Sequence, residues 1–374
     1  SKNNLLRETK IPLQLTLDTD IQFLVRKELL RFNNVFQTKG SAAILMNIDN
    51  GNILSLVSLP DFDPNRRENI KDKNYINKIT KGVYELGSVF KTFTLAAALD
   101  ENLIKVDTKF LDLEKSINCG KNTIREYDKK IPKDLTAEEI LIRSGNIGSV
   151  RIGQKIGVEK FKQFLTKINL INKIEFDIDE TGIPIPFKWG KCKLATTSFG
   201  HGITTTPLQL AKGYAIVTNG GYDVNPTIIR EKSEKLIKYK KRIIKENVSK
   251  KINPILRKIV TSKEGTANLA DVKGYEIGGK TGTAEKIVSG TYSNQKKINT
   301  FASVFPISNP KFVLVVILDE PQINADYIYN YRDGSNFKLK GSPRNTSGWT
   351  TVEATGHIVE KIGPILATKY IEIN

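Results

Sequence analysis

The sequence predicts an α/β (α+β) fold in which an antiparallel sheet is built from both ends of the chain, flanked by helices, with a helical subdomain beside it. Three patterns support this prediction: apolar strands near the start, helical periodicity through the middle, and strands again toward the end. With 374 residues, 39% of them hydrophobic, the chain is long enough to bury a large core.

The first part of the chain contains the start of the sheet. Residues 12–17 alternate as in a short strand, and the capping residue Asp18 precedes apolar positions over 21–36 that are spaced for one face of an amphipathic helix. Two apolar runs, 42–48 and 53–59, flank an Asn-Gly pair that favours a tight hairpin. These runs predict the first two strands.

The rest of the chain is predicted to form a loop, then helices, then further strands. Residues 60–81 are polar and predict a mobile loop. Helical patterns follow over 88–99 and through most of 135–170. Three further strands and a closing helix are predicted, over 275–286, 300–305, 312–319 and 351–366.

Composition narrows the class of protein. The longest strongly apolar stretch, Phe312–Leu318, is far shorter than the roughly 20 residues that a membrane-spanning helix needs, so we expect a soluble chain, and any export signal or anchor would have to lie outside it. The net charge of +18 is compatible with nucleic-acid binding, and its densest source is Arg230–Lys263. No RNA motif or zinc-finger spacing accompanies it, so we favour a solvated basic face and predict no nucleic-acid partner.

The cysteines and histidines point to no metal, cofactor or histidine-based triad. Cys119 and Cys192 form no CxxC pair, and the sequence does not reveal whether they are bonded; two buried free thiols are the default expectation. Only His201 and His357 are present, so we expect catalysis to use another base.

The first motif is Ser88-Val89-Phe90-Lys91, which opens an apolar helix directly after Gly87. Serine and lysine three apart share a helix face. A lysine desolvated by apolar neighbours has a lowered pKa, so Lys91 can take the proton of Ser88 and make it nucleophilic. The helix amino terminus also offers an amide to a developing oxyanion. A helix cap beside a surface lysine is the alternative.

The second motif is Ser144-Gly145-Asn146, which follows a predicted helix. Serine can relay a proton and asparagine can hold an amide. These residue types are also ordinary in turns, so the triplet alone has little specificity.

The third motif is Lys280-Thr281-Gly282-Thr283, on a predicted strand after two glycines. Glycine in a strand marks a close approach of another backbone, so a substrate strand can dock there. The lysine and both threonine hydroxyls would then address a substrate carboxylate, and the Thr283 amide would complete an oxyanion pocket. Common surface chemistry is the alternative.

In this order, SxxK, SxN and KTG resemble the signature of the serine penicillin-recognising enzymes. Gly145 departs from the SDN form, which affects substrate preference more than the proton relay. The chain is most similar to class B penicillin-binding proteins and, within them, to the septal, division-type group called penicillin-binding protein 3. The likeness is carried by residues 42–65, 82–100, 199–215, 264–286, 301–321 and 346–366.

This resemblance implies the penicillin-recognising fold and a peptidoglycan D,D-transpeptidase that β-lactams inhibit covalently. Ser88 would be acylated by a stem peptide as the terminal D-alanine leaves, and Lys91 would accept its proton. Ser144 would protonate the leaving amine, and Asn146 would hold the substrate amide and orient Lys91. An acceptor stem-peptide amine would then resolve the acyl-enzyme.

The resemblance also implies substrate-binding roles for Lys280, Thr281, Gly282 and Thr283. His201, in a Gly-His-Gly turn, is interpreted as a packed loop residue and not as part of the cleft.

The resemblance further implies a membrane-anchored enzyme in the periplasm or on the outer face of the cytoplasmic membrane, with divisome proteins and a glycosyltransferase as partners. Residues 1–40 would be the end of an amino-terminal pedestal module with its linking strand and helix, and 41–374 the transpeptidase domain.

Two alternatives use the same fold. A serine β-lactamase would hydrolyse its acyl-enzyme, but the stretch from Ser144 to Lys280 looks too long for the common form of that enzyme. A non-catalytic β-lactam sensor or divisome scaffold would not need every motif side chain, and all of them are present.

Overall fold

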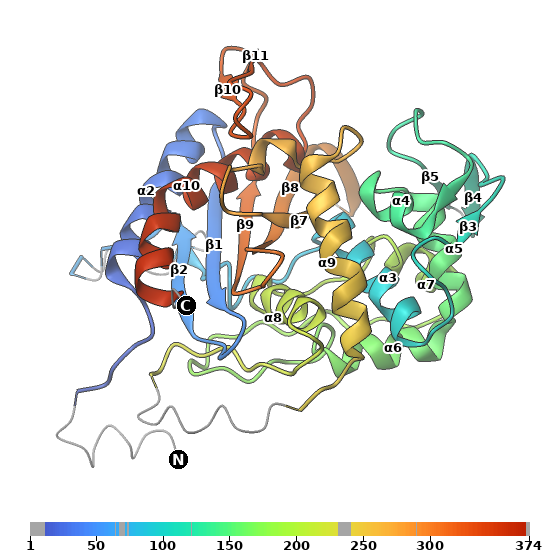
Figure 1. The fold of residues 1–374 in the computed structure, drawn as a ribbon, viewed down its shortest axis with the longest axis horizontal. Coiled ribbons are helices and arrows are strands. Elements are labelled where there is room, and N and C mark those ends of the chain that lie inside the picture. Colours follow the sequence, from blue (N-terminus) through green and yellow to red (C-terminus); the bar gives the residue numbers. More distant parts are fainter. Residues whose placement is uncertain are drawn as a thin grey trace.

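The computed structural model describes residues 12–63, 65–66, 72, 75–120, 122–230, 241–288 and 290–371. Its centre is a five-stranded antiparallel sheet in the order β2-β1-β9-β8-β7 (Figure 1). The strands are β1 (Gly40–Asn47), β2 (Ile53–Leu59), β7 (Gly278–Val288), β8 (Thr291–Phe305) and β9 (Phe312–Asp319). The prediction of a sheet assembled from both chain ends is confirmed.

The central strands are covered on both faces. β1 and β9 are buried along almost their whole length, which requires a helical layer on each side of the sheet. The helices α2 (Thr19–Val35) and α10 (Thr351–Tyr370) pack against each other and the sheet. The helices α8 (Pro207–Thr218) and α9 (Glu246–Thr261) pack together and form the other layer.

The helix predicted over 21–36 is confirmed as α2. The Asp18 carboxylate accepts from the amides of Asp20 and Ile21, which satisfies the helix amino terminus as its sequence position indicated. Ile21, Val25, Leu29 and Phe32 are buried in the hydrophobic core. Residues 12–17 do not form the predicted strand, because a single bridge from Leu15 to Ile229 is their only sheet pairing among the described residues.

A helical lobe stands beside the β7 edge of the sheet (Figure 1). Its helices and short strands are η2 (Gly87–Phe90), α3 (Lys91–Asp100), β3 (Lys109–Phe110), β4 (Ser116–Cys119), β5 (Asn122–Arg125), β6 (Leu135–Thr136), α4 (Ala137–Ile142), α5 (Asn146–Ile156), α6 (Val158–Lys167) and α7 (Lys191–Thr197). The helices predicted over 88–99 and 135–170 are confirmed. The remaining elements are η4 (Asn268–Ala270), β10 (Ile328–Asn330), β11 (Lys338–Lys340) and η5 (Ser347–Trp349), of which η4 and η5 contribute residues to the cleft described below.

The default expectation of two buried free thiols is wrong. Cys119 and Cys192 form a disulfide that joins the end of β4 to α7, and Cys192 is exposed. The two residues are 73 positions apart, and only the folding of the lobe brings their Cα atoms to 5.3 Å. Spacing in the sequence could not reveal that geometry.

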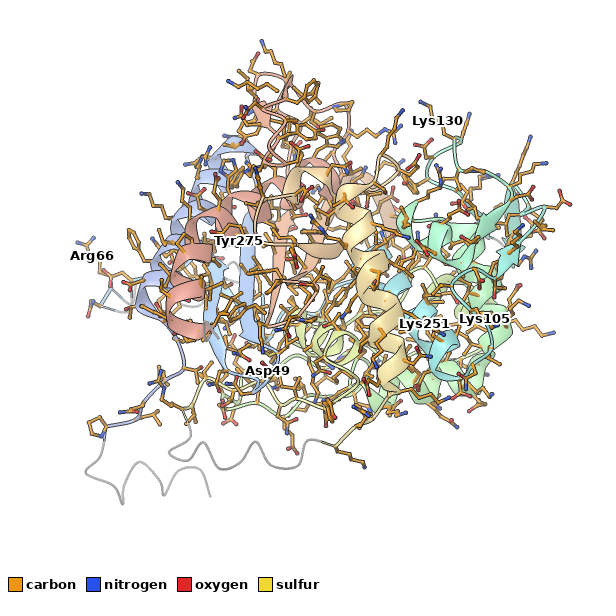
Figure 2. The ribbon with its side chains drawn as sticks, viewed as in Figure 1. Asp49, Arg66, Lys105, Lys130, Lys251 and Tyr275 are labelled. Carbon is orange, nitrogen blue, oxygen red and sulfur yellow. A yellow bond between two sulfur atoms is a disulfide. The ribbon has the colours of Figure 1, made fainter. Side chains whose placement is uncertain are left out.

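The basic stretch 230–263 contains a helix that the sequence did not indicate. The part over 231–240 lies outside the described residues, but α9 follows and buries Val248, Ile252, Ile255 and Ile259. Its helical period is hidden by lysines and by the internal Pro254. On the lobe, Lys105 and Lys130 are exposed, as expected of solvated basic residues (Figure 2).

The predicted mobile loop over 60–81 lies partly outside the described residues, and its described part contains neither an α-helix nor a strand. β8 starts earlier than the predicted strand over 300–305, because its first half is polar and exposed and so carries no apolar signal. No helix in the described part of the chain is long and apolar enough to cross a membrane.

Candidate active site

The turn that carries Ser88 is pressed against the edge strand β7. Gly87 has φ +66, and a Cβ there would lie 2.8 Å from the Thr283 carbonyl oxygen. A Cβ on Gly282 would lie 2.1 Å from the Leu86 carbonyl oxygen. Both glycines are therefore needed for the approach of the two backbones, and Gly282 packs behind the cleft without lining it.

Lys91 begins α3, one turn after Ser88, and is 1% exposed. Its Nζ donates to Asn146 Oδ1 at 2.7 Å, to the Ser144 carbonyl oxygen at 2.5 Å and to Ser144 Oγ at 3.2 Å. Within the described part of the chain, the Ser88 hydroxyl makes no hydrogen bond. Lys91 is thus held by the second motif, while the Ser88 hydroxyl faces the cleft without a hydrogen bond from the described residues.

Ser144 lies between two lysines. It occupies the turn between α4 and α5 with φ +58, and its Oγ also accepts from Lys280 Nζ at 2.8 Å. Lys280 is fully buried on β7. Because this hydroxyl accepts from two amines, its own hydrogen remains free to be donated into the cleft.

The two lysines have lowered pKa values because they are buried. Burial lowers the pKa of Lys91 to about 7, although the Glu126 carboxylate opposes this shift. Burial, reinforced by the neighbouring Lys91 amine, lowers the pKa of Lys280 well below its ordinary value. Near neutral pH a large fraction of Lys91 is therefore uncharged, in the direction that the sequence predicted.

The hydroxyls of Thr281 and Thr283 are held on the β7 edge. Thr281 Oγ1 lies 2.7 Å from Thr266 Oγ1, and Thr283 Oγ1 accepts from the Ser347 amide at 3.0 Å. Thr266 and Ser347 had no signal in the sequence, because they lie in segments far from the motif they support.

A cleft of about 730 Å³ opens where these groups meet. Five of the eight residues singled out from the sequence line it: Ser88, Ser144, Asn146, Thr281 and Thr283. Lys91 and Lys280 are buried behind Ser144. The structure brings the three motifs together, as the sequence analysis proposed, and leaves Gly282 as a packing residue whose role in substrate binding stays a prediction.

His201 also lines the cleft, contrary to its interpretation as a packed loop residue. Its ring lies between those of Phe199 and Tyr292, at 5.9 and 4.6 Å between centroids. The Glu85 carboxylate, which lines the same end, accepts from the Gly202 amide and the Tyr292 hydroxyl. Tyr292 comes from β8 and is far from His201 in the sequence, so no local pattern marked this contact.

No cluster of three or more His, Cys, Asp and Glu side chains among the described residues is placed to hold a metal ion. The expectation of a reaction without metal or cofactor stays a prediction.

Comparison with known proteins identifies the family. Residues 41–335 match the model of the penicillin binding protein transpeptidase domain. The probable peptidoglycan D,D-transpeptidase FtsI of Caulobacter vibrioides is 31% identical over 366 residues, which cover 96% of this chain and 59% of that protein. The stage V sporulation protein D of Bacillus subtilis is 32% identical over 326 residues, which cover 83% of this chain and 50% of that protein. The chain thus spans between half and three fifths of the length of these relatives.

Solved structures share the fold. The transpeptidase domain of Burkholderia pseudomallei penicillin-binding protein 3 has a TM-score of 0.79 at 24% identity, covering 96% of this chain and 98% of that one. Mycobacterium tuberculosis penicillin-binding protein 3, in complex with aztreonam, has a TM-score of 0.80 at 24% identity, covering 97% and 80%. With its three motifs gathered in one cleft and a family match over most of its length, this chain belongs to the penicillin-binding protein transpeptidase family.

Proposed function

We propose that this chain is the transpeptidase part of a peptidoglycan D,D-transpeptidase, in which Ser88 is acylated by a stem peptide ending in D-alanyl-D-alanine. One observation carries the proposal: a fully buried lysine, Lys91, with a pKa near 7, lies one helical turn from a serine that faces the cleft. A buried amine that is neutral near pH 7 is suited to take a serine proton.

In the acylation step, Ser88 Oγ attacks the carbonyl carbon of the penultimate D-alanine while Lys91 Nζ takes the hydroxyl proton. The bond to the nitrogen of the terminal D-alanine then breaks. Ser144 gives its proton to that nitrogen and regains one from Lys91, which lies 3.2 Å away. Free D-alanine leaves, and the peptide remains as an ester on Ser88.

In the transfer step, the amine of an acceptor stem peptide attacks the ester carbonyl and loses a proton to Lys91. The ester bond breaks, Ser88 recovers that proton, and a new amide crosslinks the two peptides. Asn146 orients Lys91 through its Oδ1, and its Nδ2 has a second hydrogen for the substrate beside the one given to the Arg125 carbonyl.

The edge of β7 suits an extended peptide. It is the last strand of the sheet, so a substrate strand can add to it by backbone hydrogen bonds. Lys280 and the hydroxyls of Thr281 and Thr283 bind the terminal carboxylate in this proposal, and the amides of Ser88 and Thr283 bind the oxyanion.

Intact mass measurement after mixing with penicillin tests the proposal. We expect one penicilloyl group per chain, located by peptide mapping at Ser88, and no adduct on Ser88→Ala, whose thermal unfolding should match the wild type. An adduct on another residue, or one that persists on Ser88→Ala, would remove Ser88 from its role.

The same samples distinguish the alternatives. A transpeptidase trapped by a substrate mimic releases hydrolysed penicillin very slowly after one equivalent has bound. Sustained turnover of several molecules per second would instead indicate a β-lactamase. A stable adduct together with no exchange of a stem peptide's terminal D-alanine would favour a sensor or scaffold.

We further propose a septal role, at the periplasmic or outer face of the cytoplasmic membrane, with peptidoglycan stem peptides as substrates, β-lactams as inhibitors, and divisome proteins and a glycosyltransferase as partners. The likeness to a protein named FtsI supports the septal role. The division into a pedestal end, 1–40, and a transpeptidase domain, 41–374, is likewise proposed. α2 belongs to the pedestal end by that division, yet it packs on the sheet of the transpeptidase domain.

A further inference from the structure

Glu126 is a charged residue beside the proposed catalytic groups that the mechanism above does not use. It follows β5 directly, and its two carboxylate oxygens accept from the backbone amides of Asn146 at 2.7 Å and Ile147 at 2.9 Å. The carbonyl oxygen of the preceding Arg125 accepts from Asn146 Nδ2 at 2.8 Å. Two consecutive residues therefore fix both the backbone and the side chain of Asn146.

These bonds replace a missing cap. α5 begins at Asn146, its N-cap Gly145 has no side chain to accept from the first amides, and no acidic residue lies in its first turn. Glu126 supplies both the acceptors and the negative charge from a different segment. The hairpin that carries it is tied to α7 by the Cys119–Cys192 disulfide.

We propose that Glu126 is a positioning residue for acylation, which fixes Asn146 against Lys91 and places a negative charge that faces the Lys91 amine. The proposal rests on the proposed function of Lys91. Asn146 Oδ1 accepts from Lys91 Nζ at 2.7 Å, so a shift of the start of α5 moves the partner of the catalytic base.

The charges that face Lys91 come from two elements. The Lys280 amine on β7 lies across Ser144, and the Glu126 carboxylate lies beyond Asn146. Glu126 raises the pKa of Lys91 against the larger lowering by burial. Removing its charge should therefore lower that pKa further, so that Lys91 stays neutral at a lower pH but becomes a weaker base.

Glu139 provides a matched control. It is also a glutamate at a helix amino terminus of the same lobe, where it forms a capping box with Thr136 at the start of α4. Its replacement by glutamine should weaken a helix cap without moving Asn146 or the charge near Lys91.

The test compares the pH dependence of penicillin acylation, followed by intact mass, in the wild type, Glu126→Gln, Glu126→Asp and Glu139→Gln. For Glu126→Gln we expect the acidic limb to move to lower pH by at least about 0.5 unit and the plateau rate to fall about tenfold. Glu126→Asp keeps the charge, so its acidic limb should stay within 0.2 unit, taken as about the error of such a profile. Glu139→Gln should follow the wild type.

A second measurement does not depend on acylation. The pKa of Lys91 can be followed by NMR in protein with ¹³C-labelled lysine, with the resonance assigned by its absence in Lys91→Arg. A lower pKa in Glu126→Gln than in the wild type would show that the Glu126 charge acts on Lys91 even if penicillin labels no residue, an outcome that would defeat the proposed function. An unchanged pKa and a superimposable pH profile would overturn the role of Glu126, while labelling of Ser88 would leave the proposed function intact.

Discussion

The central sheet and the helical lobe hold their parts of the site in different ways. On the sheet, β7 is paired with β8 from Gly278 to Val288, and strands buried on both faces lie behind it. In the lobe, Ser144 has φ +58 and Asn146 is held by single hydrogen bonds from a hairpin. The sheet-side groups thus depend on the packed core, whereas Ser144 and Asn146 in the lobe depend on a few polar contacts that can be removed one at a time.

The largest expected effect is on the lobe side. Lys91→Ala should slow penicillin acylation by at least about 100-fold, because the proposed base is lost. Lys212 is also buried, in α8, where it pairs with Asp223 and lies away from the cleft, so Lys212→Ala is the matched control and should retain the acylation rate. Stopped-flow labelling with penicillin measures the acylation rates of both variants. Equal rates would remove Lys91 from the mechanism.

A substitution in the core of the sheet should lower the stability of the protein and leave the acylation rate nearly unchanged. Leu314 is fully buried in β9, so Leu314→Ala should lower the free energy of unfolding by about 2–5 kcal/mol through lost burial and a cavity. The folded fraction should still acylate within about twofold of the wild-type rate, since β9 lies two strands from the β7 edge. Denaturant unfolding and penicillin labelling should be measured on one preparation. If the acylation rate fell together with the stability, the contrast between sheet and lobe would be contradicted.

Removing the disulfide should affect the lobe more than the sheet. Cys119→Ser with Cys192→Ser opens a loop of 73 residues and should cost about 2–4 kcal/mol of stability. Hydrogen exchange should then increase in β4, β5 and the start of α5, while the amides of β1 and β9 stay protected below the global unfolding limit. Uniform loss of protection across both regions would show that the lobe does not open separately.

The smallest effect is expected at the edge of the sheet. Thr283→Val should lower the second-order acylation rate about tenfold, because the hydroxyl that we propose to meet the substrate carboxylate is lost. Thr283→Ser keeps the hydroxyl and serves as the control. If Thr283→Val acylates as fast as Thr283→Ser, the hydroxyl has no part in carboxylate binding.

The sheet could be predicted from the sequence because its information is local. β9 is a continuous apolar run, and β1 and β2 flank an Asn-Gly turn, so periodicity and turn chemistry located them within about two residues. The three motifs could also be found, because each is a short string of residues with a known chemistry.

The supports of the site could not be predicted in this way. Glu126 contacts a helix 20 positions away, and Ser347 contacts Thr283 from 64 positions away. No local sequence pattern marks such pairs, because the two residues come into contact only when the chain has folded. The disulfide and the placement of His201 escaped prediction for the same reason.

The most direct measurement is exchange of the terminal residue of a stem peptide. The protein is incubated with a pentapeptide that ends in D-alanyl-D-alanine and with an excess of a different D-amino acid as amine acceptor, and the products are identified by mass. We expect D-alanine release with formation of the exchanged peptide by the wild type, and neither product with Ser88→Ala. Release of D-alanine by hydrolysis alone, or exchange that survives in Ser88→Ala, would contradict a transpeptidase with Ser88 as its nucleophile.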